Sequence, residues 1–161
     1  MTGATGLIGK ALISRILEQA NTDLGEPIHI TALVRNAAKA QYLSTKGVQL
    51  VEGLESVNFD HLDVVINLAG EPIADKRWSN AQKEEICNSR WQITEQIAKA
   101  INQAKTPPKV FISGSAIGIY GRQSEAPISE SFDGYHKEFT HKICQHWESL
   151  ALGAKSETTR V

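Results

Sequence analysis

The chain begins with a run of regularly spaced glycines, in the stretch MTGATGLIGKAL. Gly3, Gly6 and Gly9 stand three residues apart, and an apolar segment with helical periodicity starts at Leu7. Because glycine has no Cβ and tolerates positive φ, a backbone of this kind can come close to a phosphate group. The following helix would add free N–H groups and the positive end of its dipole. The run predicts a phosphate-binding turn, although a glycine-rich turn without a ligand stays open until its context is known.

That context is an alternation of short β-branched segments with segments of helical spacing. The predicted strands cover residues 28–34, 48–51, 62–67, 110–113 and 158–161, and the predicted helices cover 7–20, 37–46, 80–103 and 139–152. This alternation predicts an α/β fold with a Rossmann-like, doubly wound parallel sheet. The glycine run then lies where such a fold binds a dinucleotide, so residues 1–161 are expected to form one dinucleotide-binding domain.

Both ends of the chain are unusual for this fold. The glycine turn should follow a strand, yet only Met1 precedes Thr2, and the last predicted strand has barely started when the chain stops at Val161. We therefore expect a sheet that is truncated at both ends, with the C-terminal substrate part largely absent. Either residues that precede Met1 are missing or another segment fills the position of the first strand.

Charge and cysteine content exclude several classes of function. The net charge is −1, from 17 basic and 18 acidic residues, which does not favour binding to nucleic acid or to an anionic membrane. No apolar run reaches the length of a membrane-spanning helix. Cys87 and Cys144 stand far apart without the spacing of metal ligands, so no metal site and no disulfide framework is expected. A cytoplasmic location is the simplest interpretation.

Three longer motifs resemble a known superfamily. Residues 2–9, TGATGLIG, resemble the TGxxGxxG fingerprint of the extended short-chain dehydrogenase/reductases, the epimerase/dehydratase superfamily. The stretches NLAGEPI at 67–73 and FISGSA at 111–116 are similar to the NADP-dependent epimerase-like subfamily, whose members are labelled sugar-nucleotide epimerases or cell-division-inhibitor-like proteins. The resemblance implies an NADP-dependent oxidoreductase or epimerase that acts on a small-molecule substrate, such as a nucleotide sugar. The alternative is a catalytically silent NADP-binding regulatory or scaffold protein. The oligomeric state is left open, with a homo-oligomer among the candidates.

Several residues are candidates for holding the cofactor. Arg35 follows the second predicted strand, where Arg suits the 2′-phosphate of NADP and an acidic residue would suit NAD, so NADP is favoured. Its alternative role is that of a solvated surface residue. Gly53-Leu54 stands where related enzymes pack the adenine, and the small residues after Asn67 would let a ribose approach the sheet, while Glu71 could bond a ribose hydroxyl or cap a turn. The full set of candidate cofactor contacts is Gly3, Thr5, Gly6, Leu7, Ile8, Gly9, Arg35, Gly53, Leu54, Asn67, Leu68, Ala69, Gly70 and Glu71.

The set of catalytic residues that the superfamily uses is incomplete in this sequence. Ordinary members of the superfamily use a Ser, a Tyr and a Lys, with the Tyr as acid/base. Ser115 matches the Ser, but Thr140 and Cys144 stand in the Tyr and Lys positions, so the YxxxK pair is absent. Tyr120 is a candidate for a displaced acid, with a packing role as its alternative.

The helix at 139–152 also carries histidines near a cysteine. His141 and Cys144 are three residues apart, but His136 and His146 do not share their helix face. A metal site needs more ligands on one face, so a solvated helix face is favoured over a metal site.

Overall fold

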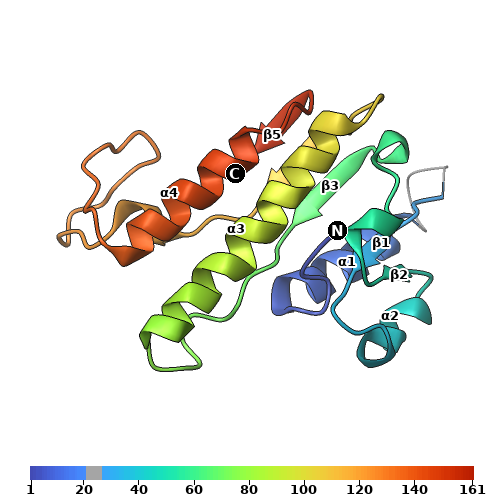
Figure 1. Cartoon of the computed structure of the whole chain (residues 1–161), viewed down its shortest axis with the longest axis horizontal. Coiled ribbons are helices and arrows are strands. Elements are labelled where there is room, and N and C mark those ends of the chain that lie inside the picture. Colours follow the sequence, from blue (N-terminus) through green and yellow to red (C-terminus); the bar gives the residue numbers. More distant parts are fainter. Residues whose placement is uncertain (21–26) are drawn as a thin grey trace.

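The computed structural model describes residues 1–20 and 27–161, and its strands are all parallel (Figure 1). The strands are β1 (Thr31–Leu33), β2 (Gln49–Val51), β3 (Val64–Asn67), β4 (Val110–Ser113) and β5 (Thr158–Arg160). Strand β1 pairs with β2, and β3, β4 and β5 pair in that order. The parallel α/β architecture expected from the sequence is confirmed.

Helices connect the strands, as parallel pairing requires. They are α1 (Leu7–Ala20), α2 (Gln41–Ser44), α3 (Asn80–Gln103) and α4 (Phe139–Leu152), with short 3₁₀ turns at Ala38–Ala40, Leu54–Ser56, Phe59–His61 and Ile117–Tyr120. Helix α3 begins after Ser79, whose side chain accepts a hydrogen bond from the N–H of Gln82 at 3.2 Å. It ends at Gln103, shortly before two prolines that cannot continue a helix.

The two groups of strands are joined by the first two residues of the chain. The Met1 amine donates to the carbonyl oxygen of Thr31, and the Met1 carbonyl accepts from the N–H of Leu33 at 2.9 Å. On the other side, the N–H of Thr2 donates to Ile66 at 2.9 Å, and Thr2 forms a parallel bridge with Asn67. Met1 and Thr2 thus lie between β1 and β3, so the order across the sheet is β2, β1, Met1–Thr2, β3, β4, β5.

Alternation along the strands places helices on both faces of this sheet. Val65 and Phe111 point to the side of α3 and α4, where they pack with Ile97 and Ala151. Helices α3 and α4 run side by side over this face (Figure 1). On the opposite face, Ala32 and Val34 pack against Ile13 of α1 and Leu43 of α2, with Met1 at the border of this cluster.

An apolar cavity of about 340 Å³ continues the line of Met1 and Thr2 between β1 and β3. Ile30 and Thr31 line one wall, and Val64, Val65 and Ile66 line the other. Met1 and Thr2 fill only the end of the first-strand position that carries the glycine turn. The alternative in which another segment of the described chain fills the rest of that position is therefore wrong.

Helices α1, α3 and α4 and strand β4 have the predicted bounds, and strands β2, β3 and β5 are one or two residues shorter than predicted. Two further elements differ more. The predicted strand at 28–34 is reduced to Thr31–Leu33, the part that pairs in register with Gln49–Val51 of β2. The predicted helix at 37–46 is divided into a 3₁₀ turn and the single turn α2.

Candidate functional site

The glycine turn is packed so tightly that two of its glycines cannot be replaced without a shift of the backbone. Gly3 has φ +66°, and a Cβ on it would contact the Leu68 carbonyl. A Cβ on Gly9 would overlap the carbonyl oxygen of Gly3. By contrast, a Cβ on Gly6 would meet only the Gly3 carbonyl oxygen, at 3.2 Å, and otherwise open space. The turn therefore leaves a bare backbone surface at Gly6, beside the first turn of α1.

The first turn of α1 is open to solvent. Thr5 and Gly6 are exposed, and the side chains of Leu7 and Ile8 are 90% and 66% exposed, although both are apolar. The N–H groups in a first helical turn have no partner within the helix, so they are available to an anion. These four of the six candidate residues thus form an exposed surface at the start of α1, whereas Gly3 is half-buried and Gly9 is buried.

The candidate residues that follow β1 and those that follow β2 differ in their exposure and contacts. Arg35 is exposed and forms no ion pair within the described residues, so its guanidinium is free to meet a ligand. Nearby, the N–H of Ala37 donates to the Glu52 carboxylate at 2.6 Å, which ties the segment after β1 to the end of β2. The Glu55 side chain folds over Gly53, and Leu54 is half-buried against the core.

Asn67 is fully buried and holds the end of β3 in place. Its side-chain oxygen accepts from the Thr2 hydroxyl at 2.6 Å, and its amide donates to the Thr94 hydroxyl of α3 at 2.8 Å. The Thr2 hydroxyl in turn accepts from the N–H groups of Leu68 and Ala69, each at 3.1 Å. The sequence suggested Asn67 as a ligand contact, but its amide is used up within the protein, so it fixes the loop that follows. Thr94 was not foreseen, because only the packing of α3 against β3 brings it there.

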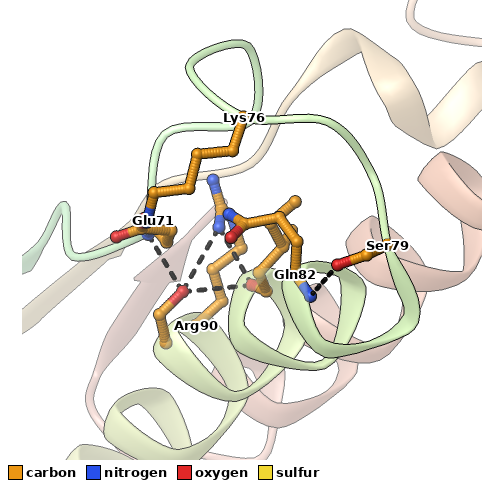
Figure 2. Close-up of polar contacts among 7 residues, drawn as sticks. Glu71, Lys76, Ser79, Gln82 and Arg90 are labelled. Carbon is orange, nitrogen blue, oxygen red and sulfur yellow. Dashed lines mark hydrogen bonds and ion pairs between the residues drawn. The ribbon is translucent and has the colours of Figure 1, made fainter.

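Figure 2 shows how the loop after Gly70 is tied to α3. The N–H of Glu71 donates to the Ser89 hydroxyl at 2.9 Å, and the Glu71 carboxylate pairs with Lys76 at 2.8 Å. The hydrogen bond from Lys76 lowers the pKa of the Glu71 carboxyl. These contacts hold Glu71 within the loop and against α3, and its two expected roles, a bond to a ribose hydroxyl or a turn cap, stay predictions.

Arg90 extends from α3 towards the same loop (Figure 2). Its Nη1 donates to the Ile86 carbonyl at 2.9 Å and lies 3.4 Å from the Ser89 hydroxyl. The guanidinium carbon lies 5.4 Å from the centre of the Trp147 ring, and burial lowers the pKa of Arg90. The residues after β3 therefore meet a half-buried cation from the helix beneath them.

At the end of β4, Ser115 donates a hydrogen bond to the carboxylate of Glu148 on α4. Glu148 also lines an open cavity of about 510 Å³ together with Tyr135 and His141. The sequence pointed to Ser115 but did not assign Glu148 as its partner. The sequence does contain a signal for this partner, because Glu148 stands one helical turn after Cys144 and therefore on the same face of the helix.

Thr140 and Cys144, which the sequence interpretation assigns to the Tyr and Lys positions, face the same segment. A Cβ on Gly118 would lie 3.1 Å from Thr140 and 3.5 Å from the sulfur of Cys144. Cys144 is 3% exposed, and burial is the main cause that raises the pKa of its thiol. Neither side chain is a substitute for a phenol assisted by lysine.

Tyr120 packs within the loop that precedes α4. Its ring stacks on Tyr135 with centres 6.2 Å apart and meets the edge of Phe132 at 6.1 Å. These contacts are those of a packing residue, and its role as a displaced acid stays a prediction.

The expectation of a solvated histidine face on α4 is confirmed for His146, which is exposed, but is wrong for His141 and Cys144. His141 is 2% exposed and hydrogen bonds to the Ile119 carbonyl, and Cys144 is buried beside it. His146 instead packs edge-on against Trp91. Within residues 1–20 and 27–161, no three His, Cys, Asp or Glu side chains gather as metal ligands would, and no helix there could cross a bilayer.

Comparison with known proteins agrees with this arrangement. The chain is 32% identical over 98% of its length to the epimerase family protein SDR39U1 homolog, chloroplastic, of Arabidopsis thaliana, and 33% identical over 92% of its length to the epimerase family protein YfhF of Bacillus subtilis. It covers 45% and 47% of these two proteins, so the chain spans about half the length of the curated relatives it matches.

Among solved structures, the human epimerase family protein SDR39U1 (isoform 2) with NADPH superposes with a TM-score of 0.75 at 26% identity. The match covers 99% of this chain and 51% of the human one. A UDP-glucuronic acid 4-epimerase from Bacillus cereus superposes with a TM-score of 0.72 at 21% identity, over 92% of this chain and 49% of that one, which shows the shared fold. The model of the NAD dependent epimerase/dehydratase family matches residues 1–158, and the chain therefore belongs to that family.

Proposed function

We propose that this chain is the NADP-binding part of an epimerase-type oxidoreductase. The observation that carries the proposal is the glycine turn, in which Gly3 and Gly9 permit a close backbone fold and Gly6 leaves its surface bare. A pyrophosphate placed there would meet the open first turn of α1, where the helix dipole and unpaired N–H groups favour an anion. The turn therefore fits the dinucleotide that the family name implies.

The choice of NADP over NAD rests on Arg35. This exposed side chain stands at the end of β1, where the ribose of the adenosine half would lie in a dinucleotide fold. A guanidinium there can donate charge-assisted hydrogen bonds to a 2′-phosphate, which NAD lacks. The human relative solved with NADPH supports the same choice.

When bound, the cofactor would supply hydride exchange with a carbonyl or hydroxyl carbon, and the chain's own residues would orient the substrate. Ser115, at the carboxyl end of β4, is proposed to position the substrate oxygen, with Glu148 holding its hydroxyl. A nucleotide sugar or a similar small carbonyl compound is the proposed substrate, in keeping with the family. Two buried free cysteines suit a reducing compartment such as the cytoplasm.

A silent cofactor-binding protein is the second candidate. It is favoured by the sequence interpretation that assigns Thr140 and Cys144 to the positions of the Tyr and Lys, and by the burial that raises the pKa of the Cys144 thiol. Such a protein would bind NADPH and turn over no substrate.

Titration of NADPH and NADH against the wild type and Arg35→Ala tests the proposal. We expect Arg35→Ala to weaken NADPH binding about tenfold, the effect of one lost charge-assisted contact, and to leave NADH binding unchanged. Arg15→Ala is the matched control, because Arg15 is an exposed α1 residue that pairs with Glu18 at 3.7 Å. Equal affinities of the wild type for both cofactors would remove the role of Arg35, and no binding of either would overturn the proposed function.

A further inference from the structure

The Arg90 guanidinium is held rigidly but is not neutralised. Hydrogen bonds to the Ile86 carbonyl and the Ser89 hydroxyl fix one of its nitrogens on α3, and its carbon lies over the Trp147 ring, 5.4 Å from the ring centre. No acidic side chain of the described residues lies within 4.0 Å of it. The carboxylate of the adjoining loop, on Glu71, is already engaged by Lys76.

A half-buried cation without a counter-ion is costly, since burial removes part of its hydration. The carbonyl and the aromatic ring offset only part of this cost. Burial raises the pKa of the Cys87 and Cys144 thiols, so they carry no balancing charge near neutral pH. The Glu71 carboxylate attracts the guanidinium only through space and is paired with Lys76, so Arg90 has no direct counter-ion at this place.

The place itself is the carboxyl edge of the sheet. A Cβ on Gly70, three residues after β3, would lie 2.9 Å from the guanidinium carbon. A Cβ on Gly114, directly after β4, would lie 3.2 Å from the Trp147 ring that the guanidinium lies against. Arg90 thus stands beneath the ends of β3 and β4, and the segment after β4 carries Ser115. Open α/β sheets bind their ligands at this edge.

The position of Cys144 is a second reason to expect Arg90 to meet a ligand anion. It stands at the helix position where ordinary members of the superfamily carry a Lys, so α4 brings no cation to the crevice. Trp147 stands three residues after Cys144 on α4, and its ring centre lies 5.4 Å from the Arg90 guanidinium carbon, which places a cation from α3 close to that position.

We propose that Arg90 is an anion-binding residue of the crevice and takes one oxyanion, a phosphate or a carboxylate, of the ligand that lies beside Ser115. The inference rests on the proposed function for the crevice in which it lies, but it concerns a different contact from those of the glycine turn and Arg35. The oxyanion can come from the dinucleotide or from a second ligand, the substrate.

Two titrations of Arg90→Gln distinguish these sources. The first measures the Kd of NADPH, and the second measures binding of inorganic phosphate to protein saturated with NADPH, by calorimetry. We expect a weakening of about tenfold in the first if the cofactor supplies the oxyanion, and in the second if the substrate does. Lys99→Gln is the matched control, because it removes an exposed charge from the same helix, paired with Glu95 at 2.7 Å, and should change neither. Unchanged affinities of Arg90→Gln in both titrations would overturn the inference.

Two further measurements keep the test decisive. If Arg90→Gln does not fold, as judged by circular dichroism, Arg90→Met is titrated in its place, and wild-type affinity for both ligands overturns the inference, because Met keeps an apolar stem but carries no charge. If the wild type binds no NADPH, the proposed function fails, and phosphate is titrated onto the ligand-free wild type and Arg90→Gln instead. A loss of phosphate binding in the variant then supports the anion site on its own, and equal binding or none in the wild type overturns it.

Discussion

The hydroxyl of Thr2 donates to the side-chain oxygen of Asn67 at 2.6 Å, and this buried contact joins the start of the chain to the end of β3. Both residues are nearly inaccessible, with exposed fractions of 5% and 0%. Because Asn67 also donates to Thr94, one side chain connects the glycine turn, the central strand and α3. The geometry of the candidate cofactor crevice therefore depends on a residue that no ligand needs to touch.

Asn67→Ala should lower the free energy of unfolding by about 1–3 kcal/mol, because it leaves the buried hydroxyl of Thr2 without its acceptor. Urea denaturation monitored by circular dichroism measures the change. Gln96→Ala, at an exposed position of α3, should have an effect close to zero. If both variants unfold alike, the Asn67 network does not stabilise the fold.

Gly9→Ala should damage both stability and cofactor binding. The new methyl group would overlap the Gly3 carbonyl, and such overpacking costs about 1–3 kcal/mol because the backbone must shift. Urea denaturation and NADPH titration measure the two effects. Gly153→Ala is a suitable control, since Gly153 has right-handed helical dihedrals of −72° and −10°. Retention of wild-type NADPH affinity by Gly9→Ala would show that the turn does not need its tight fold for binding.

The elements with strong local signals could be predicted from the sequence, and the site contacts could not. Helix α3 has a capping Ser79 at its start and prolines after its end, so its bounds follow from local chemistry. Strand β1 is shorter than its apolar pattern, because its length is set by neighbours that lie elsewhere in the sequence. On α4, the polar character of His141 favoured a solvated face, whereas its spacing with Cys144 and Trp147 forms a buried stripe. The place of Arg90 between Gly70 and Trp147 depends on three separate elements, so no local pattern could reveal it.

The hydrogen bonds accepted by the Asp60 carboxylate predict that the fold loses stability in acid. Its carboxylate accepts from the N–H groups of Thr106 and Lys105, at 3.0 and 2.6 Å, and the bond from Thr106 is the main cause that lowers the pKa of Asp60 below its ordinary value of 3.8. A carboxyl whose pKa is lower in the folded state stabilises the fold above its ordinary pKa, and this contribution is lost as the pH falls through the lowered value.

Wild type and Asp60→Ala should therefore differ most in unfolding free energy near neutral pH, and the difference should shrink as the pH falls from about 6 to about 3. Urea denaturation at several pH values measures it. Asp63→Ala is the control, because the Asp63 side chain is 85% exposed and its nearest cation, Lys109, is 3.9 Å away. A difference between wild type and Asp60→Ala that stays constant with pH would contradict the prediction.

The last prediction concerns turnover. If the protein is an enzyme, Ser115→Ala should lower the turnover of its substrate by roughly tenfold or more, because a positioned polar group at the reacting oxygen typically contributes at least that much. Thr140→Val and Cys144→Ala should leave turnover nearly unchanged, since neither side chain has a suitable proton affinity near neutral pH. The measurement is a screen of nucleotide sugars and small carbonyl compounds that follows the absorbance of NADPH, with Ser129→Ala in the exposed loop as the control. Full activity of Ser115→Ala together with an inactive Cys144→Ala would contradict the role of Ser115 and indicate a mechanism that uses the Cys144 thiol. Absence of turnover across the screen, with NADPH still bound, would establish the silent binding protein instead.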